Sequence, residues 1–347
     1  PVMTATARAL PLPTRRHTLL ALAAAATLAA VAPGARAQAA AADPVRMVDA
    51  LEGTFGTHAG FRRSHAKGVC AAGHFTATPE ARALSVARVF DGSRVPVVAR
   101  FSVGGGNPMA SDKGRTVRGL AVAFELPGEQ RWLTSNLSAP VFFVGKPEHF
   151  AGFIEARRPD PATGRADPAR VRAFNEAHPD TKPQIDWLAQ NPVPASYAGA
   201  AYHGIHAFRF VDAQGRAQMA KWTFQPEAGL QGLTDAELAA RPDHFLVDEL
   251  RGRVAQAPVA YRLVLQLAEA GDPTTDPTVQ WPATRRTVDA GRLVIDHVEA
   301  GAGGACEGIT YNPLVLPPGI QASADPVLNA RAAPYAVSLG RRLSAPR

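Results

Sequence analysis

The sequence predicts an α+β domain built around an antiparallel barrel or a strongly curved sheet. Several runs of alternating apolar and polar residues are typical of strands, one pair of runs is joined by a short polar turn, and helical patterns fall in the long connections. About 310 residues follow the N-terminal segment, which is enough for one large domain or two small ones. No internal repeat stands out.

Residues 1–37 have the pattern of an export signal peptide. Arg15 and Arg16 precede an apolar run over residues 19–32, and Ala35-Arg36-Ala37 is typical of a cleavage site. The run is about 14 residues long, and a transmembrane helix needs roughly 20. The twin-arginine and the general export routes both fit. We therefore expect a bacterial periplasmic or secreted protein, with residues 38–347 as a single domain and no stable membrane anchor after cleavage.

The first half of this domain combines one capped helix with strands. A helix is predicted from Pro44 because Asp43 is a good N-cap and proline suits the first helical position. Alternating or apolar runs then predict strands over residues 66–77, 95–103 and 118–126. A helix over residues 147–161 should be stopped by its two prolines, and residues 160–200 predict short helices and loops.

The second half contains a hairpin, two more strands and two helices. Residues 204–211 and 216–224 alternate on either side of the turn sequence Asp-Ala-Gln-Gly, which is typical of a hairpin. Residues 244–257 have helical spacing, and residues 260–267 and 291–298 predict strands. The last helix should open at Asp325-Pro326, again with an acidic N-cap before a proline.

The charge balance and the cysteines restrict the function only weakly. The four arginines of the first 37 residues account for four of the seven formal net positive charges, which leaves +3 on the rest. We therefore expect no nucleic-acid partner. Cys70 and Cys306 could form a disulfide in an exported protein, but they are far apart in the sequence, and two free thiols are an equal alternative.

The last helix carries the sharpest local motif. Arg331 and Tyr335 are four residues apart and therefore share one helical face. A guanidinium beside a phenol favours the ionised form, and a phenolate can serve as an axial ligand of haem iron. The simpler interpretation is a surface pair with Tyr335 in the core, and the motif alone favours that interpretation.

Five separated segments change this balance. They are RRSHAKGV, PVVARFSVGGG, VRGLAVAFEL, APVFFV and PPGIQASADPVLNARAAPY, in this order. With them, the sequence from about Phe55 to Arg342 resembles the haem catalase family, specifically its short, minicatalase-like, catalase-related peroxidases. The resemblance implies a catalase-like antiparallel β-barrel core without the C-terminal helical domain of full catalases. It also implies bound haem b, with ferric iron and an axial tyrosinate.

The resemblance assigns a role to each matching residue on the peroxide side. His65 matches the distal histidine, which accepts a proton from one peroxide oxygen and delivers it to the other. Ser102 matches the serine that orients this imidazole, and Arg62 and Arg100 match arginines that pair with the haem propionates. Two pocket aromatics, which core packing could equally explain, complete the set: Phe143 and Phe150.

The iron-ligand side is also represented. Tyr335 matches the iron ligand and Arg331 its neighbour, while His206 and Asp325 match the outer members of a charge network that tunes the iron. Arg342 has the offset of a further propionate contact.

The peroxide side departs from full catalases. These usually place two asparagines directly before TP-x-FF, whereas Asn136 here lies about two positions early and Ser138 fills the aligned position. Either a small shift brings Asn136 into the pocket as the catalytic amide, or the site lacks this amide. The acid and the bulky residue of the usual substrate channel align with Thr116 and Gly104, which predicts a wider, altered channel.

These departures favour a haem peroxidase that reduces hydrogen peroxide or organic hydroperoxides with a small organic electron donor, in defence against oxidative stress. Three alternatives stay open: a true catalase, an enzyme that rearranges fatty-acid hydroperoxides, and a haem-binding barrel without turnover. We expect a monomer or a small homo-oligomer.

Overall fold

The computed structural model describes residue 1, residues 42–301 and residues 303–344. The predicted signal peptide therefore lies almost entirely outside the described residues. The described residues from 42 onward form one compact unit. In the described part of the chain, no helix combines the length and the apolar character needed to cross a membrane.

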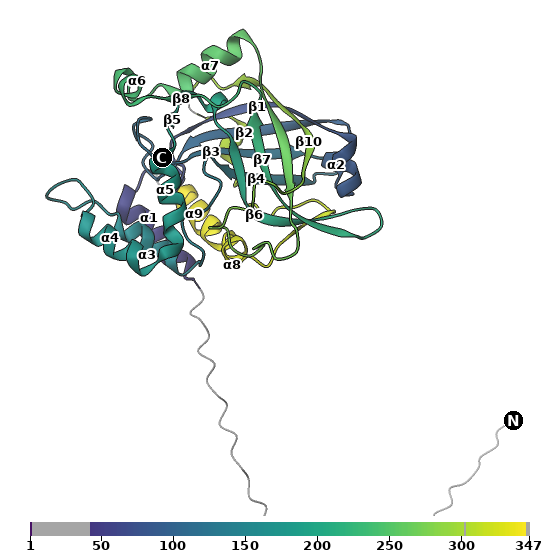
Figure 1. Ribbon diagram of the computed structural model, residues 1–347, viewed down its shortest axis with the longest axis horizontal. Coiled ribbons are helices and arrows are strands. Elements are labelled where there is room, and N and C mark those ends of the chain that lie inside the picture. The colour runs from purple at the N-terminus through teal and green to yellow at the C-terminus, as the bar shows by residue number, and fades with distance from the viewer. Residues whose placement is uncertain (2–41, 302, 345–347) are drawn as a thin grey trace, which may run out of the picture. The chain divides into compact units, whose positions relative to one another are not determined.

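Eight antiparallel strands of the described chain close into a barrel (Figure 1). Their order is β6-β4-β3-β2-β1-β10-β9-β7, and β7 pairs back with β6 to complete the ring. Their bounds are β1 Gly68–Ala77, β2 Arg94–Val103, β3 Arg118–Glu125, β4 Arg131–Leu137, β6 Tyr202–Val211, β7 Ala217–Pro226, β9 Val259–Leu267 and β10 Thr287–Val298. The short β11 (Ile320–Ala322) extends the sheet beside β6, and β5 (Val193–Pro194) pairs with β8 (Gly232–Leu233). The predicted antiparallel barrel is confirmed.

Inward-facing aromatic side chains fill the barrel. An eight-stranded barrel has an interior just wide enough for its own side chains, and alternate residues of each strand point into it. The rings of Phe124 and Trp132 stack with centroids 4.8 Å apart, and Trp132 meets Trp222 edge-on at 5.3 Å. All three side chains are buried, so this part of the barrel interior is a packed core.

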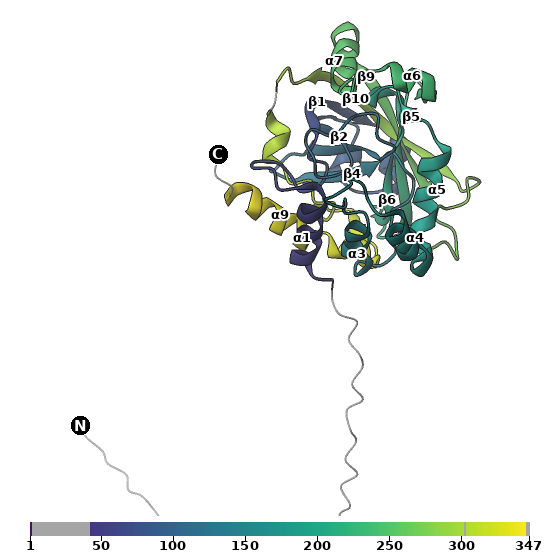
Figure 2. The same cartoon turned by 90° about the vertical axis from the view of Figure 1, so that its left-hand side faces the viewer.

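Helices occupy the connections, and most of them gather at one side of the barrel (Figures 1 and 2). They are α1 Pro44–Phe55, α2 Pro79–Leu84, α3 His149–Ala156, α4 Pro168–Ala177, α5 Lys182–Gln190, α6 Asp235–Ala240, α7 Leu246–Gln256, α8 Pro326–Ala330 and α9 Ala332–Ser344. Helix α1 begins as predicted, since the Asp43 side chain accepts a hydrogen bond from the backbone N–H of Val45 at 2.9 Å. It packs against both α3 and α9.

One strand and the last helix differ from the prediction, and the structure decides between a disulfide and free thiols. Strand β4 was not predicted, and the last helix is divided at Arg331 into α8 and α9. Pro334 lies in the first turn of α9, and a proline inside a continuous helix would interrupt its hydrogen bonds. Cys70 on β1 and Cys306 form a disulfide, with Cα atoms 5.4 Å apart. This bond ties the short 3₁₀ helix η4 (Ala305–Gly308) to the barrel.

Candidate active site

A cavity of about 640 Å³ lies between strands β2–β4 and helices α1, α3, α5, α8 and α9. Its size falls in the range of small-molecule and cofactor sites, ~300–1,000 Å³. Most of its lining is apolar, but seven arginines also line it, and no aspartate or glutamate of the described residues does. A cavity with this lining favours a large apolar ligand that carries negative charge.

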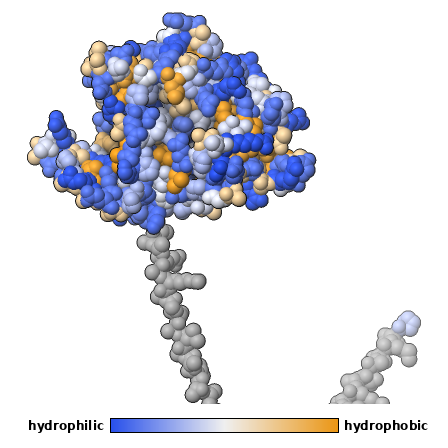
Figure 3. All heavy atoms as spheres, in the orientation of Figure 1, coloured by the Kyte–Doolittle hydropathy of each residue, from blue (hydrophilic) through white to orange (hydrophobic). Residues whose placement is uncertain are grey.

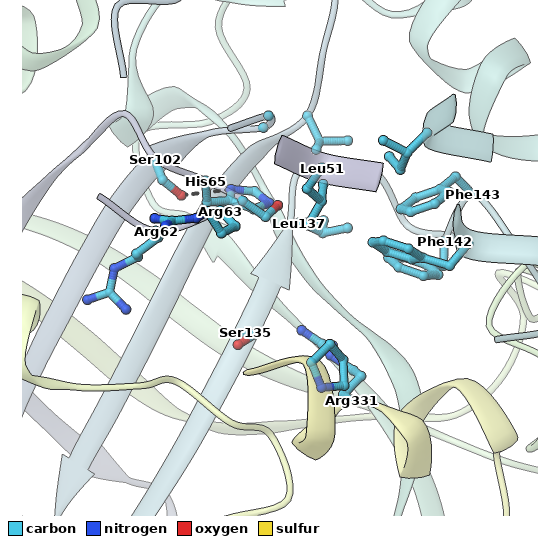
Figure 4. Close-up of a pocket in the computed structure, with 18 of the residues that line it drawn as sticks. Leu51, Arg62, Arg63, His65, Ser102, Ser135, Leu137, Phe142, Phe143 and Arg331 are labelled. Atoms are coloured by element: carbon cyan, nitrogen blue, oxygen red, sulfur yellow. Dashed lines mark hydrogen bonds between the residues drawn. The ribbon is translucent and has the colours of Figure 1, made fainter. Parts of the chain in front are cut away.

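His65 faces the cavity from the segment just before β1. Its Nδ1 lies 2.9 Å from the Ser102 hydroxyl oxygen on β2, so the expected His–Ser pair is present (Figure 4). Its backbone is left-handed, with φ of 52°, a conformation that non-glycine residues adopt mainly where a site requires it. Lost hydration and the charges of Arg100 and Arg331 lower the pKa of His65 to about 4. The imidazole is therefore neutral at pH 7.

Gly119 on β3 makes room for this pair, although the sequence did not single it out. A Cβ atom there would lie 2.5 Å from the Ser102 hydroxyl oxygen and 2.9 Å from His65 Nδ1. These distances are shorter than van der Waals contact, so any side chain would displace the imidazole or the hydroxyl. The glycine within VRGLAVAFEL is thus part of the site.

Arg62, Arg100 and Arg342 form a cationic cluster around the Glu307 carboxylate. The N–O distances to this carboxylate are 2.9 Å from Arg100, 3.4 Å from Arg62 and 3.8 Å from Arg342. Three positive charges against one negative charge leave this wall cationic. The Nε of Arg62 is buried and has no hydrogen-bond partner among the described residues. A buried donor without a partner indicates that the cluster can accept a further anion.

Backbone carbonyls hold two of these arginines in place. Arg62 donates to the carbonyl oxygens of Cys306 and Ile309, both at 2.8 Å. Arg100 donates to the carbonyl oxygen of His65 at 2.7 Å. Arg100 therefore also supports the backbone of His65, a contact that the sequence did not predict.

Arg331 and Tyr335 lie at the junction of α8 and α9 and both line the cavity. Arg331 Nη2 donates to the Tyr335 hydroxyl oxygen at 2.5 Å, and the cationic donor makes this hydrogen bond charge-assisted. Figure 4 shows His65 and Ser102 on one side of the cavity, Arg331 on the opposite side, and Phe143 on a third. The predicted pair therefore faces the predicted histidine across one space.

His206 and Asp325 form a buried pair at the start of α8. His206 Nδ1 lies 2.6 Å from one carboxylate oxygen of Asp325, while the other oxygen accepts from the N–H of Val327 at 2.8 Å and so caps α8. Burial lowers the pKa of His206 to about 4, although the hydrogen bond to Asp325 acts in the opposite direction. No hydrogen bond of the described residues joins this pair to Arg331, so the expected network is present as two separate pairs.

Phe143 and Phe150 form part of the aromatic wall, as expected. Their ring centroids are 5.3 Å apart, and both line the cavity. Phe143 also meets Phe153 on α3 at 4.4 Å.

Asn136, the candidate catalytic amide, lies in the cavity lining, but both ends of its amide are hydrogen-bonded to other residues. Its Oδ1 accepts from Trp222 Nε1 at 2.7 Å, and its Nδ2 donates to the Leu120 carbonyl oxygen at 2.7 Å and to Thr134 Oγ1 at 3.0 Å. The amide is therefore engaged with the barrel core. Leu137, the next residue along β4, faces the cavity near His65 (Figure 4).

Comparison with known proteins agrees with this geometry. The family model described as "Catalase" matches residues 54–346. The chain belongs to the catalase family. A catalase-related peroxidase of Synechococcus elongatus is 44% identical over 86% of this chain and 88% of that protein, and one of Mycolicibacterium paratuberculosis is 35% identical over 88% and 96%. Membership of this family implies that the chain binds haem.

Full-length catalases match less of their own length. A catalase of Glandirana rugosa is 30% identical over 81% of this chain, which covers 56% of that protein. In three dimensions, a fungal catalase aligns with a TM-score of 0.76 at 25% identity, over 82% of this chain and 60% of that chain. Each match therefore spans about four fifths of this chain and somewhat more than half of the other protein.

Proposed function

We propose that this catalase-family chain is a haem peroxidase that reduces hydrogen peroxide or organic hydroperoxides with a small organic electron donor. A hydroperoxide ROOH takes up two electrons and two protons to become the alcohol ROH and water, and two one-electron donors supply them. The observation that carries the proposal is one apolar cavity with a neutral His65 on one side and the Arg331–Tyr335 pair on the other.

The residues of the cavity fit haem b. The cationic cluster with the unpartnered Arg62 Nε would hold the propionates, the aromatic wall would contact the macrocycle, and Tyr335 would be the axial ligand as a phenolate. Arg331 would stabilise this phenolate through its short hydrogen bond. When bound, haem would supply a redox-active iron that takes two oxidising equivalents from the peroxide.

His65 would move the proton. Ser102 engages Nδ1, which leaves Nε2 as the ring atom free for proton transfer. A neutral imidazole can accept a proton from one peroxide oxygen and return it to the other, a role worth roughly 10²–10⁴-fold in rate. The low pKa of His65 keeps this acceptor available at neutral pH.

Peroxidase rather than catalase turnover is favoured by the wall next to His65. Leu137 places an apolar side chain where an amide was expected, and the amide of Asn136 is engaged in the core. Gly104 and Thr116 also line the cavity with small side chains. A site whose Asn136 amide is held by the barrel core, and which is reached past small residues, suits entry of an organic donor better than the ordered binding of a second peroxide.

Export to the periplasm and a role in oxidative-stress defence complete the proposal. The Cys70–Cys306 disulfide supports an oxidising compartment. The face of the protein shown in Figure 3 is mostly hydrophilic, and its hydrophobic patches are separated from one another. We propose a monomer or small homo-oligomer with residues 1–37 removed.

The decisive experiment follows peroxide loss and dioxygen release together on the haem-loaded protein, with and without a reducing dye. Dye-dependent peroxide loss with little gas is expected. One dioxygen for every two peroxides, unchanged by the dye, would contradict the proposal. A Leu137→Asn variant, which restores an amide beside His65, should increase dioxygen release relative to dye oxidation.

A further inference from the structure

Arg157 lines the same cavity from the end of α3, and no carboxylate of the described residues forms a salt bridge with it. Its guanidinium lies over the Phe153 ring, 3.4 Å from the centroid. It donates to the Phe153 carbonyl oxygen at 3.0 Å and to Asn175 Oδ1 at 2.9 Å. Since a guanidinium has five N–H donors, these two neutral contacts leave others free, and no ion pair with Arg157 occurs within residues 42–301 and 303–344.

The other six arginines of the cavity each have an acidic or phenolic partner. These pairs are Arg62, Arg100 and Arg342 with Glu307, Arg63 with Glu52, Arg115 with Asp235, and Arg331 with Tyr335. Burial lowers the pKa of Arg157 to about 10, so its guanidinium is still protonated at neutral pH. A half-buried cation without a counter-ion favours an anionic ligand.

This cation lies apart from the cluster proposed for the haem propionates. Figure 2 shows α3 and α9 on opposite sides of α1, and α1 packs against each of them. Arg342 belongs to α9, whereas Arg157 ends α3. The carboxylates of haem therefore leave Arg157 available for a second ligand.

The wall beside Arg157 is aromatic. The Phe153 ring under its guanidinium meets Phe143 at 4.4 Å, and Phe143 meets Phe142 at 4.2 Å and Phe150 at 5.3 Å. Planar aromatic ligands pack well against such rings. A ligand with an aromatic body and one carboxylate would match both features at once.

We propose that Arg157 binds the carboxylate of a phenolic acid, and that such acids are the reducing substrates of this enzyme. This inference rests on the proposed peroxidase function. The phenol group would be the oxidised end: each molecule loses one electron and one proton, so two molecules reduce one peroxide to its alcohol, or to water, plus water. Arg157 is thus a specificity residue at the donor end of the cavity.

The test compares three phenols on the haem-loaded enzyme with hydrogen peroxide. They are 3-(4-hydroxyphenyl)propanoate, its neutral methyl ester and the cationic tyramine, whose phenol groups are electronically similar. Loss of a charge-assisted, bidentate contact is worth about tenfold or more, so the KM of the acid should be about tenfold below that of the ester. Tyramine should have the highest KM, and kcat should differ little.

Variants assign this preference to one side chain. Arg157→Gln should make the KM values of acid and ester equal, and Arg157→Lys should restore part of the difference. Arg158→Gln is the matched control, because this exposed neighbour removes the same charge without lining the cavity. Melting temperatures check that each variant is folded. Equal KM values for acid and ester in the wild type, or the same loss in Arg158→Gln, would overturn the proposal.

A binding measurement separates this inference from the proposed function. Calorimetric titration of the haem-loaded protein with the acid or the ester, without peroxide, needs no turnover. If the protein does not reduce peroxide with any donor but still binds the acid through Arg157, the peroxidase proposal fails and the carboxylate site stands. Binding that is equal for acid and ester refutes the carboxylate site.

Discussion

The hydrogen bonds of Asn136 predict that replacing this residue affects stability more than turnover. In Asn136→Ala, the Trp222 N–H would remain buried without an acceptor, since Trp222 is only 3% exposed. A stranded buried donor costs about 1–3 kcal/mol. The loss of the two hydrogen bonds from Nδ2 and of side-chain contacts brings the expected cost to about 2–5 kcal/mol of unfolding free energy.

This cost can be measured by thermal unfolding of the haem-loaded protein. At roughly 2–4 °C per kcal/mol for a domain of this size, the melting temperature should fall by roughly 5–15 °C. Turnover per folded, haem-loaded molecule at 25 °C should change by less than about threefold, because the amide is engaged by Trp222, Leu120 and Thr134. An unchanged melting temperature together with a hundredfold loss of turnover would refute this reasoning.

A double-mutant cycle with Trp222→Phe sharpens the test. This second change removes the stranded N–H but keeps an aromatic ring in the core. If the N–H is the main source of the cost, the two substitutions together should be less destabilising than their sum, by about 1–2 kcal/mol. If the two losses of unfolding free energy simply add, the cost of Asn136→Ala comes from lost packing and not from the Trp222 N–H.

Three further predictions concern the iron ligand, the distal histidine and the disulfide. Tyr335→Phe should lower haem affinity by at least about tenfold, measured as the ratio of haem to protein absorbance; full haem retention would exclude Tyr335 as the ligand. Because the pKa of His65 is about 4, the imidazole stays an acceptor until the pH approaches 4. The rate of peroxide reduction should therefore fall near pH 4, and a fall centred at 6.5 would contradict the neutral, shielded histidine. Replacing Cys70 and Cys306 by serine should cost about 2–5 kcal/mol, because the bond closes a loop of 236 residues. An unchanged melting temperature under oxidising conditions would contradict this.

The local pattern of the sequence is sufficient for much of the barrel and for the proximal motif. Alternating residues predict β9 and the β6–β7 hairpin, because side chains of a strand point alternately in and out. Asp43 and Asp325 mark the helix starts at which the structure has them. Arg331 and Tyr335 meet because residues four apart share a helix face. Each of these inferences needs only neighbours along the chain.

The remaining features depend on contacts between distant segments. The inward direction of Asn136 follows from the pairing of β4 with β3, and a shift of one residue would have turned Leu137 into the core instead. The pairing of Cys70 with Cys306 is likewise set by which segments meet in space, as is the lack of an acidic side chain among the described residues that line the cavity with Arg157. Burial also lowers the pKa of His65, because the folded protein removes water from around its imidazole ring. This loss of hydration arises only when distant segments come together around the cavity. Local sequence patterns identify the candidate residues, whereas the packing of distant segments determines which atoms of those residues face the cavity and in which charge state.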